Sequence, residues 1–203
     1  MSGDLKTQYQ LRYDECLVPL AEALVPHIQE NLSGIPRIDR IAARPKSISR
    51  FLTKAGKEQD GVPKYEEPLY QIQDQVGARI IVFYKSDVKV VTDAINKYYK
   101  HIESRDILPE NDWEFGYFGR HYILHIPSEL RVISKPELMP DFFELQIKTL
   151  FQHAWSEAEH DLGYKPGARP LSNDQLRMLA FTSAQAWGAD EAFDRLFKER
   201  STI

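Results

Sequence analysis

The stretch FFELQIKT, residues 142–149, alternates apolar and polar side chains along its whole length. In a β-strand, successive side chains point to opposite faces of the sheet. Phe143, Leu145 and Ile147 should therefore face a core, and Glu144, Gln146 and Lys148 should face the other way. The pattern predicts a strand at 142–148 with one buried face and one polar face.

Two other stretches also read as strands. ARIIVFY at 78–84 is a nearly continuous apolar run rich in β-branched and aromatic residues, which predicts a central strand buried on both faces. A further strand is expected at 118–126. A strand that is buried on both faces needs helices to cover the sheet on each side.

Helical spacing and helix punctuation predict five helices around these strands. They are a helix at about 4–32 that Pro19 and Pro26 should kink or divide, one at about 45–56 with Pro45 in its first turn, one capped by Ser86 and ending near 99, one at about 150–162, and one opened by the capping box of Ser172 and Gln175. We read EQDGVPKYEEP as a loop. Because strands and helices interleave, the predicted fold is α+β (α/β), a mixed β-sheet core flanked by helices.

The length and the cysteine content limit the organisation of the chain. With 203 residues and 42% hydrophobic content, one core is expected. We predict a single domain at 1–203, with an N-terminal helical region at about 1–35, a core at 36–165 and a C-terminal helix at 172–200. Cys16 is the one cysteine, and MSGDLKTQYQ lacks the apolar stretch of a signal peptide or membrane span. A cytoplasmic location without membrane contact is expected.

The charge is unevenly distributed along the chain. Between Arg37 and Lys64 there are eight cations and three anions, a local net of +5, whereas the whole chain carries −4 and the remainder therefore −9. A basic island on an acidic protein favours a confined anionic ligand such as a nucleotide over a long polyanion. A solvated helix face explains the same charge count.

The chain contains no G-x-x-x-x-G-K-[ST] and no G-x-G-x-x-G motif, so any phosphates must be bound by side-chain cations. On the predicted helix at 45–56, a stripe of cations falls at i, i+4, i+8 and i+11, and its members are Lys46, Arg50, Lys54 and Lys57. Like charges this close repel unless an anion lies among them, which a triphosphate would satisfy. A solvated stripe is the alternative.

Two carboxylates are candidates for a metal site. Asp74 stands just before the strand at 78–84, and Glu144 lies on the polar face of the strand at 142–148. If these strands are neighbours, the carboxylates converge, and Mg²⁺ takes a few such oxygens while leaving its other positions to water and phosphates. Without convergence, Asp74 is a turn residue and Glu144 a solvated strand residue.

Taken together, four segments resemble the synthetase domain of the RelA/SpoT family, in its single-domain form, the small alarmone synthetases. In chain order they are RPKSISRFLTK at 44–54, IQDQVGARIIVFYKSDV at 72–88, FGYFGRH at 115–121 and ELQIKTLFQHAWSEAEHDLGYK at 144–165. The resemblance implies a nucleotidyltransferase-like fold and an ATP-dependent, Mg²⁺-requiring pyrophosphokinase. Such an enzyme makes (p)ppGpp by moving pyrophosphate from ATP to the ribose 3′-hydroxyl of GDP or GTP, with AMP released.

The resemblance also implies roles for individual residues. Asp74 and Glu144 match the magnesium pair, with Glu144 also placed as general base. Five cations match the ATP site: Arg44 and Arg79 around the adenine, and Lys46, Arg50 and Lys54 on the phosphates. Four residues match the acceptor site, namely Tyr117 as the stacking ring, His121, Gln146, and Lys148, which replaces the arginine common at that point.

One departure from the family pattern leaves the acceptor open. A basic residue and a serine usually follow the motif tyrosine, whereas this chain reads Tyr117-Phe118-Gly119-Arg120-His121. Toxin-type members of the family pyrophosphorylate the 3′ end of tRNA or an adenine nucleotide, and such a member would need a neutralising antitoxin. A non-catalytic nucleotide- or RNA-binding module is the alternative of another class, favoured by the basic island and by the aromatic residues at 113–118.

The sequence leaves the assembly and the regulation of the protein open. Apolar positions on the two terminal helices allow a homo-oligomer, and they are Leu20, Leu24, Ile28, Leu179 and Phe193. The choice between GDP and GTP, the copy number and any allosteric ligand are not encoded in a readable pattern.

Overall fold

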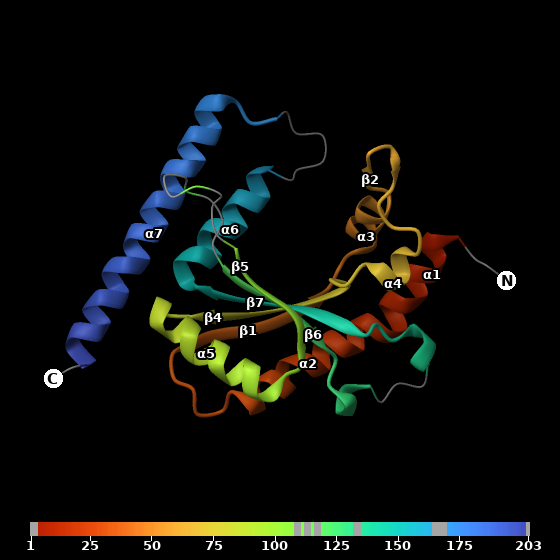
Figure 1. Ribbon diagram of the computed structural model, residues 1–203, viewed down its shortest axis with the longest axis horizontal. Coiled ribbons are helices and arrows are strands. Elements are labelled where there is room, and N and C mark those ends of the chain that lie inside the picture. The colour runs from red at the N-terminus through yellow and green to blue at the C-terminus, as the bar shows by residue number, and fades with distance from the viewer. Residues whose placement is uncertain are drawn as a thin grey trace.

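A five-stranded mixed sheet forms the centre of the protein. The computed structural model describes residues 4–107, 111, 115, 119–131, 135–163 and 170–201. The strands lie in the order β1 (Ile38–Pro45), β4 (Val76–Val82), β7 (Phe142–Thr149), β6 (Gly119–His125) and β5 (His101–Ile107). β4 and β7 are parallel, and the other neighbours are antiparallel. The predicted mixed sheet flanked by helices is confirmed (Figure 1).

The N-terminal helical region covers one face of the sheet. It consists of α1 (Leu5–Arg12), a π-helical turn (Tyr13–Leu17) and α2 (Val18–Asn31). Pro19 lies in the first turn of α2, where proline is tolerated, and Pro26 lies inside the helix. The regular α-helix is thus interrupted by the π-turn, ahead of both prolines.

The helix expected at 45–56 is shorter than predicted, because a strand that we did not predict precedes it. Pro45 is the last residue of β1, Ser47 caps the helix, and α3 runs over Ile48–Ala55. Lys46 therefore lies in the connection before the helix and Lys57 beyond its end. The prediction that four cations form a stripe along one helix is therefore wrong, since only Arg50 and Lys54 lie on α3.

The region between α3 and β4 is more ordered than the loop we predicted. β2 (Glu58–Gln59) and β3 (Val62–Pro63) pair as a small hairpin. Asp60 and Gly61 form its two-residue turn with φ angles of 54° and 79°, the left-handed conformation that Asp-Gly adopts in tight hairpins. A short helix, α4 (Pro68–Gln71), then leads to β4.

The helix after β4 begins one residue before the predicted cap. α5 (Lys85–Tyr98) is preceded by Tyr84, whose backbone N–H donates to the Asp87 carboxylate at 3.2 Å. The Ser86 cap is therefore wrong: the backbone N–H of Ser86 donates to Asp194 of the C-terminal helix instead. Two short 3₁₀ turns, Ser128–Leu130 and Pro136–Leu138, lie between β6 and β7.

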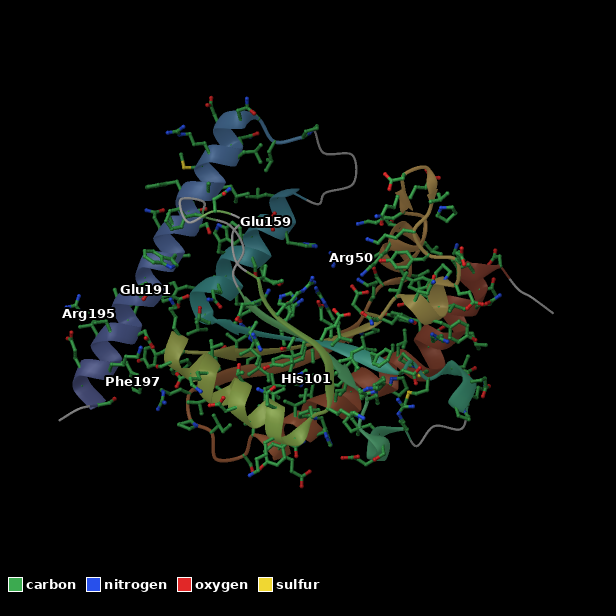
Figure 2. The ribbon with its side chains drawn as sticks, in the orientation of Figure 1. Arg50, His101, Glu159, Glu191, Arg195 and Phe197 are labelled. Carbon is green, nitrogen blue, oxygen red and sulfur yellow. The ribbon has the colours of Figure 1, made fainter. Side chains whose placement is uncertain are left out.

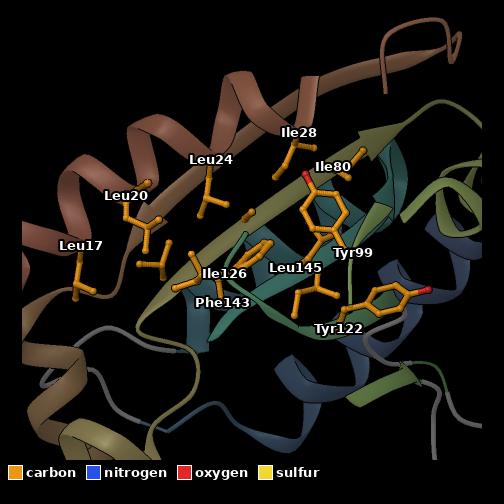
Figure 3. Close-up of a cluster of buried hydrophobic side chains, with 14 of the residues drawn as sticks. Leu17, Leu20, Leu24, Ile28, Ile80, Tyr99, Tyr122, Ile126, Phe143 and Leu145 are labelled. Atoms are coloured by element: carbon orange, nitrogen blue, oxygen red, sulfur yellow. The ribbon is translucent and has the colours of Figure 1, made fainter. Parts of the chain in front are cut away.

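The main core fills the space between the sheet and the pair α2 and α5. Leu20, Leu24 and Ile28 of α2 pack toward the sheet, where they meet alternate residues of β4 and β7 such as Ile80 and Leu145 (Figure 3). All of these side chains are buried. The three α2 residues are thus part of the core and are not available to a second copy of the chain.

Two long helices complete the fold. α6 (Leu150–Gly163) follows β7 directly, and α7 (Asn173–Ser201) runs beside α6 and α5 at one end of the molecule (Figure 1). The predicted capping box is confirmed, because Ser172 and Gln175 exchange side chain to backbone hydrogen bonds of 2.9 and 3.3 Å. Among the described helices, none has the length and apolar composition needed to cross a membrane.

Candidate active site

The polar face of the sheet brings together side chains from three adjacent strands. Gln146 of β7 lies opposite Arg79 of β4 on one side and His121 of β6 on the other. Glu144 lies one step along the same face, opposite Gly77. Because the pleat sends alternate residues to the same side, four polar side chains form a floor between α3 and α6.

Asp74, two residues before β4, is held by two lysines. Its carboxylate oxygens each lie 2.9 Å from an ammonium nitrogen, Oδ2 from Lys46 and Oδ1 from Lys54. Burial acts to raise the pKa of Asp74, but the two ammonium groups outweigh burial and lower it. The carboxylate is therefore ionised at neutral pH, with two cations where a metal would otherwise balance its charge.

Glu144 is also ionised and oriented. Its Oε1 lies 3.3 Å from His121 Nδ1, and its Oε2 accepts a hydrogen bond of 2.9 Å from Gln146. Burial again acts to raise the pKa, and the contacts with His121 and Gln146 lower it overall. The nearby charge of Asp74 also acts to raise the pKa of Glu144. Both carboxylates line the same space, so the predicted convergence is present.

The floor opens into a large polar cavity of about 650 Å³. Figure 2 labels Arg50 of α3 and Glu159 of α6 on the two sides of the space above the sheet, and both residues line this cavity. Five cations face it, namely Arg44, Lys46, Arg50, Arg79 and Lys148. A cavity of this size and charge suits a polyphosphate ligand with an attached base.

A second cavity, of about 220 Å³, adjoins the first. It is lined by Lys54, Tyr65, Gln73, Glu103 and Arg105, among others. Asp74, His121 and Glu144 line both cavities. The two carboxylates therefore stand between two spaces, an arrangement that suits a reaction joining two substrates at a shared centre.

Arg44 and Arg79 face each other near the mouth of the larger cavity. Arg44 pairs with Gly77 in the β1–β4 register, so the two arginines are diagonal neighbours. Burial and then the charge of Arg79 lower the pKa of Arg44. Glu157 of α6 anchors Arg79 with a 2.7 Å ion pair. Two planar guanidinium groups held this close can enclose a flat aromatic ring.

Lys148 is the most deeply buried of the site cations, with 5% of its surface exposed. Its ammonium donates to Ser156 Oγ at 3.0 Å. Burial, followed by the charge of Arg79, lowers its pKa to about 8. Gln146 and Lys148, which we assigned to the acceptor, line the larger cavity, and His121 lines both cavities. Of the five residues that we assigned to ATP, four line the larger cavity, whereas Lys54 lines the smaller one. Tyr117 lies outside the described residues.

Two buried residues of α1 support the site from behind, and sequence reasoning missed both. The Tyr9 hydroxyl donates to the backbone carbonyl of Lys46 at 2.8 Å, and the ring stacks on Phe51. The Arg12 guanidinium donates to Leu69 O and to Gln75 Oε1, next to Asp74. α1 thus fixes both segments that meet at the Asp74 carboxylate.

Sequence reasoning also missed the smaller cavity. Arg105 and Glu103 lie on β5, a strand we did not predict, and Tyr65 and Gln73 lie in the stretch we read as a loop and its continuation. No spacing links these residues to Glu144.

The donor chemistry fits a hard divalent cation. Asp74 and Glu144 offer ionised oxygen ligands to one shared space, and within the described residues no set of three or more histidine, cysteine, aspartate or glutamate side chains is arranged to hold a metal ion. Mg²⁺ characteristically binds one or two protein carboxylates and completes its shell with water and substrate phosphates. The two lysines on Asp74 show that this position attracts positive charge.

Comparison with known proteins places the chain in a family. A family model described as the region found in RelA / SpoT proteins matches residues 43–169. The chain belongs to the RelA/SpoT family. The matched RelA/SpoT region contains both carboxylates, the five cations of the larger cavity and His121.

Individual relatives extend the RelA/SpoT match over nearly the whole chain. The chain is 27% identical to GTP pyrophosphokinase YjbM of Bacillus subtilis (strain 168), over 95% of its own length and 88% of the relative's. Small alarmone synthetase 1 from Bacillus subtilis superimposes with a TM-score of 0.73 and 23% identity, covering 98% of this chain and 100% of that one. The structure of that synthetase bound to its product pppGpp gives a TM-score of 0.72, 22% identity and coverage of 96% and 97%.

Proposed function

We propose that the chain is a Mg²⁺-dependent (p)ppGpp synthetase, which transfers pyrophosphate from ATP to the ribose 3′-hydroxyl of GDP or GTP and releases AMP. The observation that carries the proposal is the position of Asp74 and Glu144 between two cavities. The name of the Bacillus relative and the pppGpp product in the related structure support a guanine acceptor.

The larger cavity is the proposed ATP site. Arg44 and Arg79 enclose the adenine. Lys46 and Arg50 contact the phosphates within this cavity, and Lys54, which lines the smaller cavity, contacts them from its position on Asp74. Asp74 and Glu144 would hold Mg²⁺, which when bound neutralises charge on the phosphate oxygens. With Asp74 engaged in this way, Lys46 and Lys54 can turn from the carboxylate to the triphosphate. The buried Lys148 adds a fixed positive charge beside them.

The chemistry takes place at Glu144. Its carboxylate accepts the proton of the acceptor's 3′-hydroxyl group, and the 3′-oxygen attacks the β-phosphorus of ATP. A bond forms between the 3′-oxygen and the β-phosphorus, and the bond from that phosphorus to the α,β-bridging oxygen breaks. AMP leaves with the bridging oxygen and its electron pair. His121 and Gln146 hold the Glu144 carboxylate in position throughout.

The smaller cavity is the proposed acceptor site. Arg105, which lies directly opposite His121 in the β5–β6 pair, lines this cavity and not the proposed ATP cavity. Arg105 supplies a positive charge for the 5′-phosphates of a mononucleotide. Tyr117 keeps its proposed role as the ring on which the acceptor base stacks. The nucleotide substrates support a cytoplasmic location.

A label-transfer assay tests the proposal. Purified protein is incubated with Mg²⁺ and ATP labelled at the terminal phosphate, with GDP, GTP, ADP or deacylated tRNA as separate acceptors. We expect label in GDP and GTP, and none in 3′-deoxy-GDP, which lacks the attacking hydroxyl. Label in tRNA or ADP alone would make the protein a toxin-type member, for which an antitoxin partner would be sought. No transfer to any acceptor would favour a non-catalytic nucleotide- or RNA-binding module.

A further inference from the structure

A third cavity, of about 210 Å³, lies beyond the C-terminal end of β7. It is enclosed by α5, α6, α7 and the paired ends of β5 and β6, and Figure 1 shows α7 beside α5 and α6 at this end of the molecule. It shares no lining residue with the two active-site cavities. The proposed reaction therefore leaves this cavity unexplained.

One face of α7 forms a wall of this cavity. Ser183, Ala186, Trp187 and Asp190 fall at i, i+3, i+4 and i+7. Trp155 of α6 faces them, and its indole N–H is already used by Leu179 O at 3.3 Å and Thr182 Oγ1 at 3.2 Å. With that polar edge engaged, the indole offers apolar ring surface to the cavity.

Asp190 brings an unpaired acceptor to this cavity. The residue is 3% exposed, and its Oδ2 accepts a hydrogen bond of 2.6 Å from the Thr149 hydroxyl. Its other oxygen, Oδ1, is buried and has no hydrogen-bond partner within the described part of the chain. A buried carboxylate oxygen without a donor is costly, so a donor from a ligand would stabilise it.

Arg120 brings an unpaired donor to the same cavity. One guanidinium nitrogen contacts Asp106 at 2.9 Å and another donates to Ser104 at 3.0 Å. The third, Nε, is buried and lacks an acceptor among the residues that the structure describes. The positive charge of Arg120 is largely balanced by Asp106, and that of Lys85 by Glu191. The cavity is therefore a poor site for a polyphosphate.

The sheet register places these two groups near each other. Arg120 lies opposite Ile147, and Thr149, which binds Asp190, is the next residue on the same face of β7. Such diagonal neighbours have Cβ atoms about 7–8 Å apart or slightly closer. A ligand with a donor and an acceptor on adjacent atoms can reach both groups at once.

We propose that this cavity binds a small apolar α-amino acid in its zwitterionic form. The ammonium group donates to Asp190 Oδ1, and the carboxylate accepts from Arg120 Nε. The side chain packs against apolar walls formed by Val88, Ile107, Trp155 and Trp187. The zwitterion offers one group of each sign, which matches one unpaired acceptor and one unpaired donor in a cavity where Lys85 and Arg120 already have carboxylate partners.

The test is a calorimetric titration of the full chain with L-leucine and with L-phenylalanine, repeated in the presence of a non-hydrolysable ATP analogue. We expect saturable binding that the analogue does not displace. Isopentylamine lacks the carboxylate and 4-methylpentanoate lacks the ammonium group, so each should bind at least about tenfold more weakly than L-leucine. Absence of binding by both amino acids at millimolar concentration would overturn the proposal.

Variants locate the binding in the cavity. Asp190→Asn keeps an acceptor for Thr149 and removes the charge, and it should weaken binding about tenfold. Asp194→Asn is the matched control, because it alters another buried carboxylate of α7 that does not line the cavity. Ala186→Leu fills the space while leaving the Asp190 carboxylate and its bond to Thr149 unaltered chemically, and it should abolish binding even if the first variant fails to fold. Unchanged binding in Ala186→Leu, or equal loss in the control, would refute this location.

Discussion

Alternate residues of β7 lie on opposite faces of the sheet, one face in the core and the other in the candidate active site. On one face, Leu145 and Ile147 pack into the core against α2 and α5. On the other face, Glu144 lines both cavities of the candidate active site, and Gln146 lines the larger one. Residues that are adjacent in the chain therefore differ in what they contribute: one set stabilises the fold, and the other lines the candidate active site.

The candidate catalytic residues lie on rigid elements of the fold. The carboxylate of Glu144 is placed by a central strand that has a neighbour on each side, and its backbone cannot shift without disturbing the core. The two functions should therefore be separable by single substitutions one residue apart.

Glu144→Gln should lower the rate of pyrophosphate transfer about 10³-fold or more, because it removes both the proposed base and one proposed metal ligand. The melting temperature should stay close to that of the wild type, since glutamine can still accept from Gln146 and the side chain lies outside the core. Initial rates and thermal unfolding measured on the same preparation check this. A variant that keeps near-normal turnover would show that the site is misassigned.

Leu145→Ala should lower the stability of the fold and leave the transfer rate nearly unchanged. The truncated side chain leaves a cavity in the core, which costs about 2–5 kcal/mol of unfolding free energy. Below its unfolding temperature, turnover should remain within a few-fold of the wild type. Urea titration and steady-state kinetics measure the two quantities, and a thousandfold loss of turnover in fully folded protein would contradict the division between the faces.

The sequence predicted the two faces of β7 but missed both edges of the sheet. FFELQIKT alternates because one of its sides is fully buried, and ARIIVFY is apolar because β4 is central. β1 and β5 are the edge strands, and β5 is exposed along almost its entire length. An edge strand with little buried surface does not need to alternate apolar and polar residues. The sequences of β1, IDRIAARP, and β5, HIESRDI, therefore show no such alternation.

Much of the candidate site could be predicted, but its supports could not. The motif residues at 44–54 and 144–148 were correctly expected to meet because the family resemblance fixes them as a set. Tyr9 and Arg12 act on Lys46 and Asp74 through hydrogen bonds that cross more than 35 and 55 residues of chain. Such contacts depend on how α1 packs on α3 and α4, and no local periodicity reports them.

Arg12→Met tests whether the buried helix α1 helps to position the Asp74 carboxylate. Loss of the guanidinium removes the hydrogen bonds to Leu69 and Gln75 beside Asp74. We expect about a tenfold rise in the Mg²⁺ concentration that gives half-maximal rate, corresponding to the typical loss of one charged hydrogen bond. Arg131→Met is the matched control, since Arg131 contacts Asp141 and Ile126 away from the site. An equal change in both variants would point to general destabilisation.

Lys148 should give the smallest and most specific effect, a change in pH dependence. Its pKa in the folded protein is lowered to about 8, so the ammonium loses its proton, and with it the phosphate contact, as the pH rises through 8. The kcat/KM for ATP should therefore fall above pH 8 in the wild type. Lys148→Arg remains charged and should keep its kcat/KM to higher pH. Coincident profiles for the two proteins would exclude Lys148 as the titrating group.

The most direct test of the central claim is the stoichiometry of the products. ATP labelled at the α-phosphate and ATP labelled at the γ-phosphate are each incubated with GDP, Mg²⁺ and wild-type protein, and all products are separated and counted. A site that joins two substrates across Asp74 and Glu144 should release one AMP for each guanine nucleotide that gains the γ-label, and Glu144→Gln should form neither. ADP or free phosphate as the main product would mean that a single phosphoryl group moves or is hydrolysed, and would contradict pyrophosphate transfer.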